Sequence, residues 1–180
     1  MKKIVALLLV LTLALSATVA LAAASKGGED YNKTKTGDEN EFFFKVTDEG
    51  DKVEWANAEL AKLKEAGDVG AYFGLADELA AILGEGNYKV FEFAAVVAGN
   101  YDESMGEITA NFPFATLYGK DAKVAVLLGF AAKDENGEAK MEWKAIEGGA
   151  LEDGSIEFKV DPETITRVQE ESALLAVVSK

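Results

Sequence analysis

Apolar and polar residues alternate over two segments in the second half of the chain. In residues 107–114 and 155–160 every second side chain is apolar, and the side chains between them are mostly polar. This period of two predicts strands that bury one face and expose the other. Residues 124–130 and 174–178 are apolar on both faces. We therefore expect central strands there, paired with each other or covered by helices.

The remaining strands are expected in short apolar runs. These cover residues 42–46, 53–55, 88–97 and 140–146, while the two central strands extend over residues 123–131 and 173–179. Residues 48–51 are acidic and include a glycine, which predicts a hairpin between the first two of these runs. The dipeptides Asn136-Gly137 and Asp153-Gly154 are typical of hairpin turns, so the strands that flank each of them are expected to pair.

Two helices are expected between the first strands and the rest of the sheet. Asn57 can cap a helix that runs to Ala66, and Gly67 would end it. A second helix ends at Gly84, and its apolar residues have the spacing of one helical face. They are Leu75, Leu79, Ile82 and Leu83. We expect this insertion, about residues 57–84, to pack on an edge or end of the sheet.

A third helix is expected just before the last strand. Asp161-Pro162-Glu163 combines a capping side chain, a proline at the first helical position and an acid in the first turn, and it places Ile165 and Val168 inward. Short strands with hairpin signals and few helices predict a mainly β (α+β) fold. We expect an antiparallel immunoglobulin-like β-sandwich with a short helical insertion and one crossover helix.

The first residues have the pattern of an export signal. Lys2 and Lys3 precede an apolar run at residues 4–15, and small residues follow up to Ala24. The run is shorter than the ~20 residues that span a bilayer. We therefore expect a cleaved signal peptide over residues 1–24 and no membrane insertion after cleavage.

Two further segments follow the expected cleavage site. Residues 25–41 are polar, with one tyrosine as their only large apolar residue, and predict a disordered leader. Residues 42–180 are expected to form a single β-sandwich domain that contains the helical insertion. The mature protein is expected to be secreted, and either released or held non-covalently at the cell wall.

The charge balance bears on the choice of partner. The chain has 32 acidic and 18 basic residues and a formal net charge of −14. Binders of nucleic acids or anionic membranes need basic surfaces, so we expect neither partner. The chain also has no His and no Cys. It therefore lacks the commonest general base, the thiol nucleophile and every Cys/His metal site.

Catalytic motifs are missing as well. Ser104 has no G-x-S-x-G context, no S-x-x-K sequence occurs, and Gly148-Gly149 is not followed by the lysine of a phosphate-binding loop. Carboxylates are abundant, but no pattern places two of them on facing strands as a glycosidase requires. We expect a protein that is not an enzyme and uses no cofactor.

One acidic turn is the best candidate for a calcium site. Asp102 and Glu103 follow Asn100 between two expected strands, and hard oxygen ligands suit Ca²⁺. The alternative is a solvated turn, which Asp and Asn favour because their side chains bond to nearby backbone. The solvated turn is the expectation, so Asp102 and Glu103 are weak candidates for a metal site.

Aromatic side chains are the candidates for binding a sugar. Tyr101 and Tyr118 lie in or near loops and are expected to be exposed, whereas Trp143 alternates with apolar neighbours and is expected in the core. Arg167 is the only arginine of the chain and is expected to pair with Glu163 one helical turn earlier.

Five stretches carry a resemblance to known sequences. They are GNYDESMG at residues 99–106, ITANFPFATLY at 108–118, KVAVLLGF at 123–130, EWKAIEG at 142–148 and SALLAVVSK at 172–180. Together they resemble uncharacterised secreted immunoglobulin-like β-sandwich domains of Gram-positive anaerobic bacteria, many from gut communities. The resemblance covers residues 42–180 and implies the fold. Its motifs are strand patterns and turns, so it transfers no catalytic or binding residue.

The expected function follows from these exclusions. We expect an exported, non-enzymatic extracellular interaction or accessory domain whose partner is an extracellular protein or glycan, with loops as the adaptable surface. The alternative is a carbohydrate- or calcium-binding module.

Overall fold

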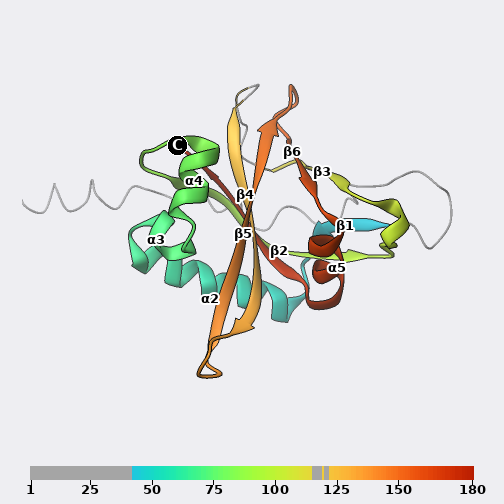
Figure 1. Ribbon diagram of the computed structural model, residues 1–180, viewed down its shortest axis with the longest axis horizontal. Helices are drawn as coiled ribbons and strands as arrows, with labels where there is room; N and C mark the ends of the chain where they lie inside the picture. Colours follow the sequence, from blue (N-terminus) through green and yellow to red (C-terminus); the bar gives the residue numbers. More distant parts are fainter. Residues whose placement is uncertain (1–41, 115–118, 120–121) are drawn as a thin grey trace, which may run out of the picture.

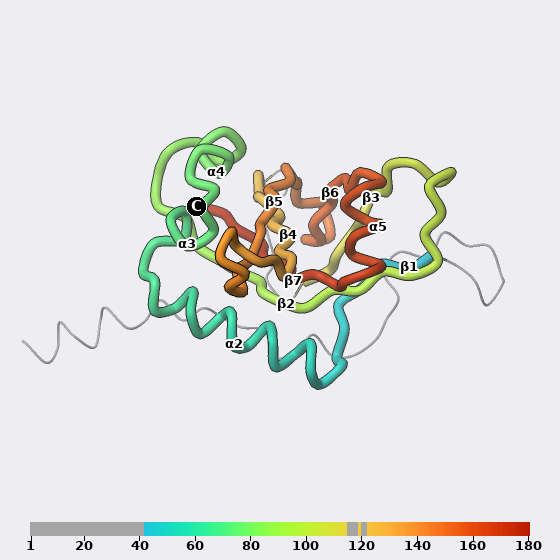
Figure 2. Tube along the Cα trace, turned by 60° about the horizontal axis from the view of Figure 1, so that its bottom comes forward, coloured from blue at the N-terminus to red at the C-terminus, as the bar shows by residue number. Residues whose placement is uncertain are grey.

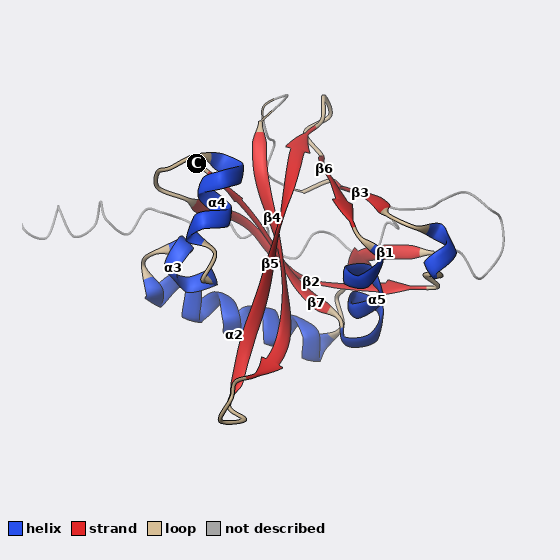
Figure 3. Cartoon of the chain, in the orientation of Figure 1, coloured by secondary structure: helices blue, strands red, loops and turns tan. Residues whose placement is uncertain are grey.

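The computed structural model describes residues 42–114, 119 and 122–180. In this part of the chain, strands and helices follow one another as Figures 1 and 3 show. The strands are β1 (Phe43–Val46), β2 (Lys89–Gly99), β3 (Ile108–Phe112), β4 (Lys123–Lys133), β5 (Ala139–Ala150), β6 (Ile156–Val160) and β7 (Ala173–Ser179). The helices are α2 (Gly50–Ala66), α3 (Val69–Phe73), α4 (Ala76–Leu83), the 3₁₀ turn η1 (Glu103–Met105) and α5 (Pro162–Glu171).

The seven strands form one hydrogen-bonded sheet. Their order is β1-β2-β7-β4-β5-β6-β3, and every neighbouring pair is antiparallel. Strands β7 and β4 pair with each other in the middle of the sheet, as expected from their apolar residues on both faces. The mainly β, α+β class is therefore correct.

The immunoglobulin-like sandwich is not confirmed, because the strands are joined in a single sheet and not in two. Twist accumulates across seven strands and curls the sheet until its two ends approach each other. Phe44 of the end strand β1 lies with its ring centroid 5.1 Å from that of Phe112 of the other end strand, β3. The sheet is therefore nearly barrel-shaped.

The concave side of the sheet encloses the larger of two apolar cores. Helix α5 closes this side, with Ile165 and Val168 buried against the sheet. The largest fully buried side chains that the strands contribute to this core are Phe44, Val96, Phe112, Val124, Val126, Leu128, Ile156 and Leu175. Both inward positions predicted for α5 are confirmed.

The opposite side of the sheet is covered by α2, α3 and α4. Figure 2 shows α2 running beneath β2 and β7, with α5 on the other side of the same strands. The helices contribute Leu60, Leu63, Phe73 and Leu79 to this second core, and the sheet contributes Ala95, Leu127, Leu174 and Val178. The two cores explain why the central strands carry no polar face.

The expected hairpin at residues 48–51 is wrong. Gly50 begins the helix α2, so residues 53–55 are helical and not a second strand. Ala56, Leu60 and Leu63 supply the buried positions of this helix. The acidic residues that resembled a turn lie at the amino end of the helix, where negative charge is favourable. Asn57 is therefore an interior residue of the helix and not its cap.

Other local predictions are confirmed. Gly67 ends α2 in the left-handed conformation, with φ of 73°. Gly137 and Gly154 lie in the turns of the β4–β5 and β5–β6 hairpins, each with φ of 82°. The expected signal peptide and leader, residues 1–41, lie outside the described residues. Among the described helices, none has the length and apolar character needed to cross a bilayer.

Candidate functional site

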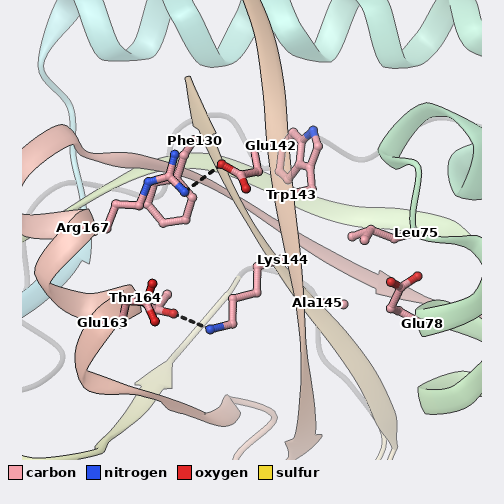
Figure 4. Close-up of a pocket in the computed structure, with 10 residues that line it drawn as sticks. All are labelled: Leu75, Glu78, Phe130, Glu142, Trp143, Lys144, Ala145, Glu163, Thr164 and Arg167. Carbon is pink, nitrogen blue, oxygen red and sulfur yellow. Dashed lines mark hydrogen bonds and ion pairs between the residues drawn. The ribbon is translucent and has the colours of Figure 1, made fainter. Parts of the chain in front are cut away.

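The groove between helices α4 and α5 is the candidate binding site. Its volume is about 390 Å³, within the range of ligand pockets. Figure 4 shows β5 running through the middle of this groove, with α5 on one side and α4 on the other. Residues 142–145 of β5 and Phe130 of β4 form its floor.

The amino end of α5 is fixed by a network that reaches the floor of the groove. Asp161 accepts hydrogen bonds from the Thr164 backbone N–H at 3.0 Å and from its hydroxyl at 2.8 Å. Lys144 of β5 donates to Asp161 Oδ2 at 2.5 Å and to Thr164 Oγ1 at 2.6 Å. This is the helix cap predicted at Asp161, extended by a lysine from the neighbouring strand.

The network sets the charge state of its acid. Burial opposes ionisation of Asp161, but the hydrogen bonds from Lys144 and Thr164 outweigh it and lower the pKa of Asp161 to about 2. The carboxylate is therefore ionised near neutral pH.

Arg167 forms the second charged contact of the groove. Its Cζ lies 4.2 Å from the centroid of the Phe130 ring. Its Nη1 donates to Glu142 at 2.9 Å, and its Nε donates to Glu171 at 3.3 Å. The expected pair with Glu163 is wrong, because Glu142 of β5 and Glu171 one turn later hold the guanidinium instead.

Two carboxylates of the groove lack such partners. Glu78 of α4 and Glu163 of α5 are exposed on opposite walls (Figure 4). Within the described residues neither forms an ion pair. Both cations of the groove are already paired, so the charge that remains for a ligand is negative.

The structure places Tyr101 differently from the prediction. Tyr101 is only 8% exposed. Its ring packs edge-on against Phe42 at 5.9 Å, and its hydroxyl donates to the carbonyl of Gly106 at 2.8 Å. The expected exposure of Tyr101 is therefore wrong, because these contacts hold the ring against the core. Tyr118, the other proposed sugar platform, lies outside the described residues.

The acidic turn beside Tyr101 has the geometry of a short capped turn. Asp102 Oδ1 accepts a hydrogen bond from the Ser104 backbone N–H at 2.9 Å, and bonding to Ser104 lowers the pKa of Asp102. Glu103 begins the turn η1 that follows. Among the described residues, no group of three or more His, Cys, Asp or Glu side chains is arranged to hold a metal ion. The structure does not bring Asp102 and Glu103 together with the groove residues.

The main groove residues were not recognised from the sequence as a site. Lys144, Thr164 and Glu78 come from a strand and two helices that are distant in the sequence, and no motif connects them. The cap at Asp161 was the only local signal for one wall of the groove.

Trp143 is 9% exposed, so its prediction as a core residue is confirmed.

Comparison of the chain with protein-family models, with curated proteins and with solved structures found no match.

Proposed function

We propose that this protein is an exported, non-enzymatic interaction domain that binds a basic segment of an extracellular protein in the groove between α4 and α5. The observation that carries this proposal is the charge pattern of the groove. Lys144 and Arg167 are paired with carboxylates of the protein itself, whereas Glu78 and Glu163 are exposed on opposite walls. Lysine or arginine side chains of a partner would complement these two acids.

The charge of the whole chain supports the same class of partner. A formal net charge of −14 attracts basic molecules over distances of about a Debye length and speeds their association. The groove then supplies the local contacts. A volume of about 390 Å³ accommodates a few side chains of a peptide.

A non-enzymatic role is supported by how the reactive groups are used. The hydroxyl of Thr164 donates to Asp161 and accepts from Lys144, so its bonding serves the cap of α5. Thr164 is also only 4% exposed. Thr164 is therefore not arranged as a nucleophile with a free base beside it.

A glycan is the competing ligand, and the groove gives it less support. Sugars stack on exposed aromatic faces. Phe130, the aromatic ring of the groove floor, is 2% exposed and lies beneath the guanidinium of Arg167. The carbohydrate-binding form of the alternative is therefore addressed by a sugar probe in the binding experiment.

The experiment titrates the mature protein with an oligolysine peptide, an oligoglutamate peptide and maltohexaose by isothermal calorimetry. We expect oligolysine to bind. The double variant Glu78→Gln/Glu163→Gln should weaken that binding by about tenfold, which corresponds to about 0.7 kcal/mol for each exposed charge. The matched control is Asp77→Asn/Glu170→Gln, which removes two exposed acids of the same helices that do not line the groove. It should change the affinity less than about twofold.

Three results would contradict the proposal. Equal losses in the two double variants would show attraction by net charge alone. Binding of maltohexaose in place of oligolysine would favour the carbohydrate-binding alternative. Failure of oligolysine to bind at low ionic strength would remove the basic partner.

The expected cleavage of the signal peptide is tested separately. Protein recovered from the medium of an expressing bacterium should begin between Ala23 and Ser25, as intact-mass measurement would show. Secreted material that retains Met1 would contradict cleavage.

A further inference from the structure

A second hollow lies beside the hairpin formed by β4 and β5, and Trp143 lines both this hollow and the groove. Residues of α2 and α3 line one side of it, and residues of the hairpin line the other. Figure 3 shows this hairpin crossing α2. The volume of the hollow is about 290 Å³, which suits a small molecule better than a peptide.

Aromatic side chains from three elements line this hollow. Trp55 comes from α2, Tyr72 from α3 and Trp143 from β5. The rings of Tyr72 and Trp143 each pack against Phe73, with centroids 5.1 and 4.6 Å apart, which fixes both. Aromatic rings arranged around a small space attract organic cations, quaternary ammonium ions above all.

A buried carboxylate adds a negative charge to the same wall. Glu59 of α2 has a side chain that is only 9% exposed. Its Oε2 accepts a hydrogen bond from the Tyr72 hydroxyl at 2.8 Å. Burial and the neighbouring Glu59 raise the pKa of Tyr72. The phenol therefore stays neutral and continues to donate to the carboxylate.

The second oxygen of this carboxylate is held by an exchangeable cation. Lys62 donates to Glu59 Oε1, but its side chain is 64% exposed. An exposed lysine gains rotamer entropy when it leaves such a contact, so another ammonium group can take its place at little cost. Lys140 of β5 also lines the hollow, is exposed and forms no ion pair among the described residues.

We infer that this hollow binds a small zwitterion that carries an ammonium group, preferably methylated, and a carboxylate. The ammonium lies among Trp55, Tyr72 and Trp143 and replaces Lys62 on Glu59. The carboxylate pairs with Lys140. This ligand class complements the buried acid, the aromatic walls and the free lysine together, whereas a simple cation leaves Lys140 unused and a simple anion leaves Glu59 unused.

The test uses three probes of nearly equal shape on the mature protein. Glycine betaine carries both charges, choline lacks the carboxylate, and 3,3-dimethylbutanoate replaces the quaternary nitrogen by carbon. Calorimetric titration should rank glycine betaine first, with each of the other two weaker by about fivefold or more.

Four single variants test whether the ranking of the three probes depends on Glu59 and Lys140. Glu59→Gln should weaken glycine betaine about tenfold, whereas Glu54→Gln, an exposed acid of the same helix outside the hollow, should leave it within about twofold. Lys140→Gln should weaken glycine betaine about fivefold and leave choline unchanged. Lys133→Gln, at the end of β4 and outside the hollow, should affect neither probe.

Several results would overturn this inference. They are equal affinities for glycine betaine and 3,3-dimethylbutanoate, equal losses in Glu59→Gln and Glu54→Gln, or no glycine betaine binding up to roughly 100 mM. If Glu59→Gln does not fold, the selective effect of the exposed Lys140→Gln still decides the question. The Glu78→Gln/Glu163→Gln variant should bind glycine betaine normally, so this site and the groove are tested separately.

Discussion

Gly129 and Trp143 face each other across the β4–β5 pair, and the indole of Trp143 fills the space that a side chain at position 129 would need. A β-carbon built on Gly129 would lie 2.5 Å from Cζ3 of Trp143. No real contact of this kind is so short, so the ring can lie there only because residue 129 is glycine. The pair lies under the helices that cover the outer face of the sheet.

The first prediction follows from this pair. Gly129→Ala should lower the free energy of unfolding by about 1–3 kcal/mol, because the fixed indole cannot move away from the new methyl group. The matched control is Gly149→Ala, also in this hairpin, where a β-carbon meets nothing within 4 Å. Urea unfolding should find the control within about 0.5 kcal/mol of the parent. Equal losses would show a general effect of glycine in strands.

The second prediction concerns the acid that caps α5. The folded pKa of Asp161 is about 2, below the unfolded value of 3.8, so its stabilisation is present above about pH 4 and is lost as pH falls toward 2. The side chain of Asp161 is 42% exposed, and solvent screening reduces the effect to about 1 kcal/mol. Asp161→Asn should therefore be about 1 kcal/mol less stable at pH 7 and nearly equal to the parent at pH 2. Chemical denaturation across this pH range checks it, and a difference that does not change with pH would contradict the assignment.

The third prediction compares two cations of the surface. Arg167 packs on Phe130 and bonds to two carboxylates, whereas Lys159 pairs with Glu107 while its own side chain is 69% exposed. Arg167→Met should cost about 1–2 kcal/mol, because it removes a stacked and partly buried pair. Lys159→Met should cost less than about 0.5 kcal/mol, since exposed pairs contribute little. Thermal unfolding should reveal the order, and the reverse order would be inconsistent with the geometry.

The fourth prediction concerns the place where the sheet nearly closes. Phe44 is fully buried with its ring edge-on against those of Phe112 and Phe158, whereas Phe43 faces the other side and is only partly buried. Phe44→Leu should cost about 1–2 kcal/mol and Phe44→Ala about 3–5 kcal/mol. Phe43→Ala should cost clearly less than Phe44→Ala. Similar losses at the two neighbouring positions would show that the contact between the ends of the sheet does not stabilise the fold.

Local features of the fold could be predicted from the sequence because they depend on a few adjacent residues. The cap at Asp161, the end of α2 at Gly67 and the turn at Gly137 each follow from the conformation that one residue type favours. The start of α2 was missed because acids before an apolar segment suit both a turn and a helix beginning. The buried Ala56, Leu60 and Leu63, spaced as on one helical face, were the signal for the longer helix.

The arrangement of the strands could not be read in the same way. A strand with two apolar faces is compatible with a sandwich, with a barrel or with one sheet covered on both sides. The contact between Phe44 and Phe112 joins residues at opposite ends of the sheet, and no local pattern indicates it. The same holds for the groove, because its charges come from β5 and from two helices on either side of it.

The place of β7 in the sheet has a consequence for how the protein is made. This strand follows every other described element in the chain, yet it lies between β2 and β4 and contributes to both cores. Until residues 173–179 leave the ribosome, β2 and β4 have no common neighbour and the two cores lack their shared wall. Completion of the sheet must therefore wait for the synthesis of β7 and depends on contacts between residues distant in the sequence, which makes folding slow.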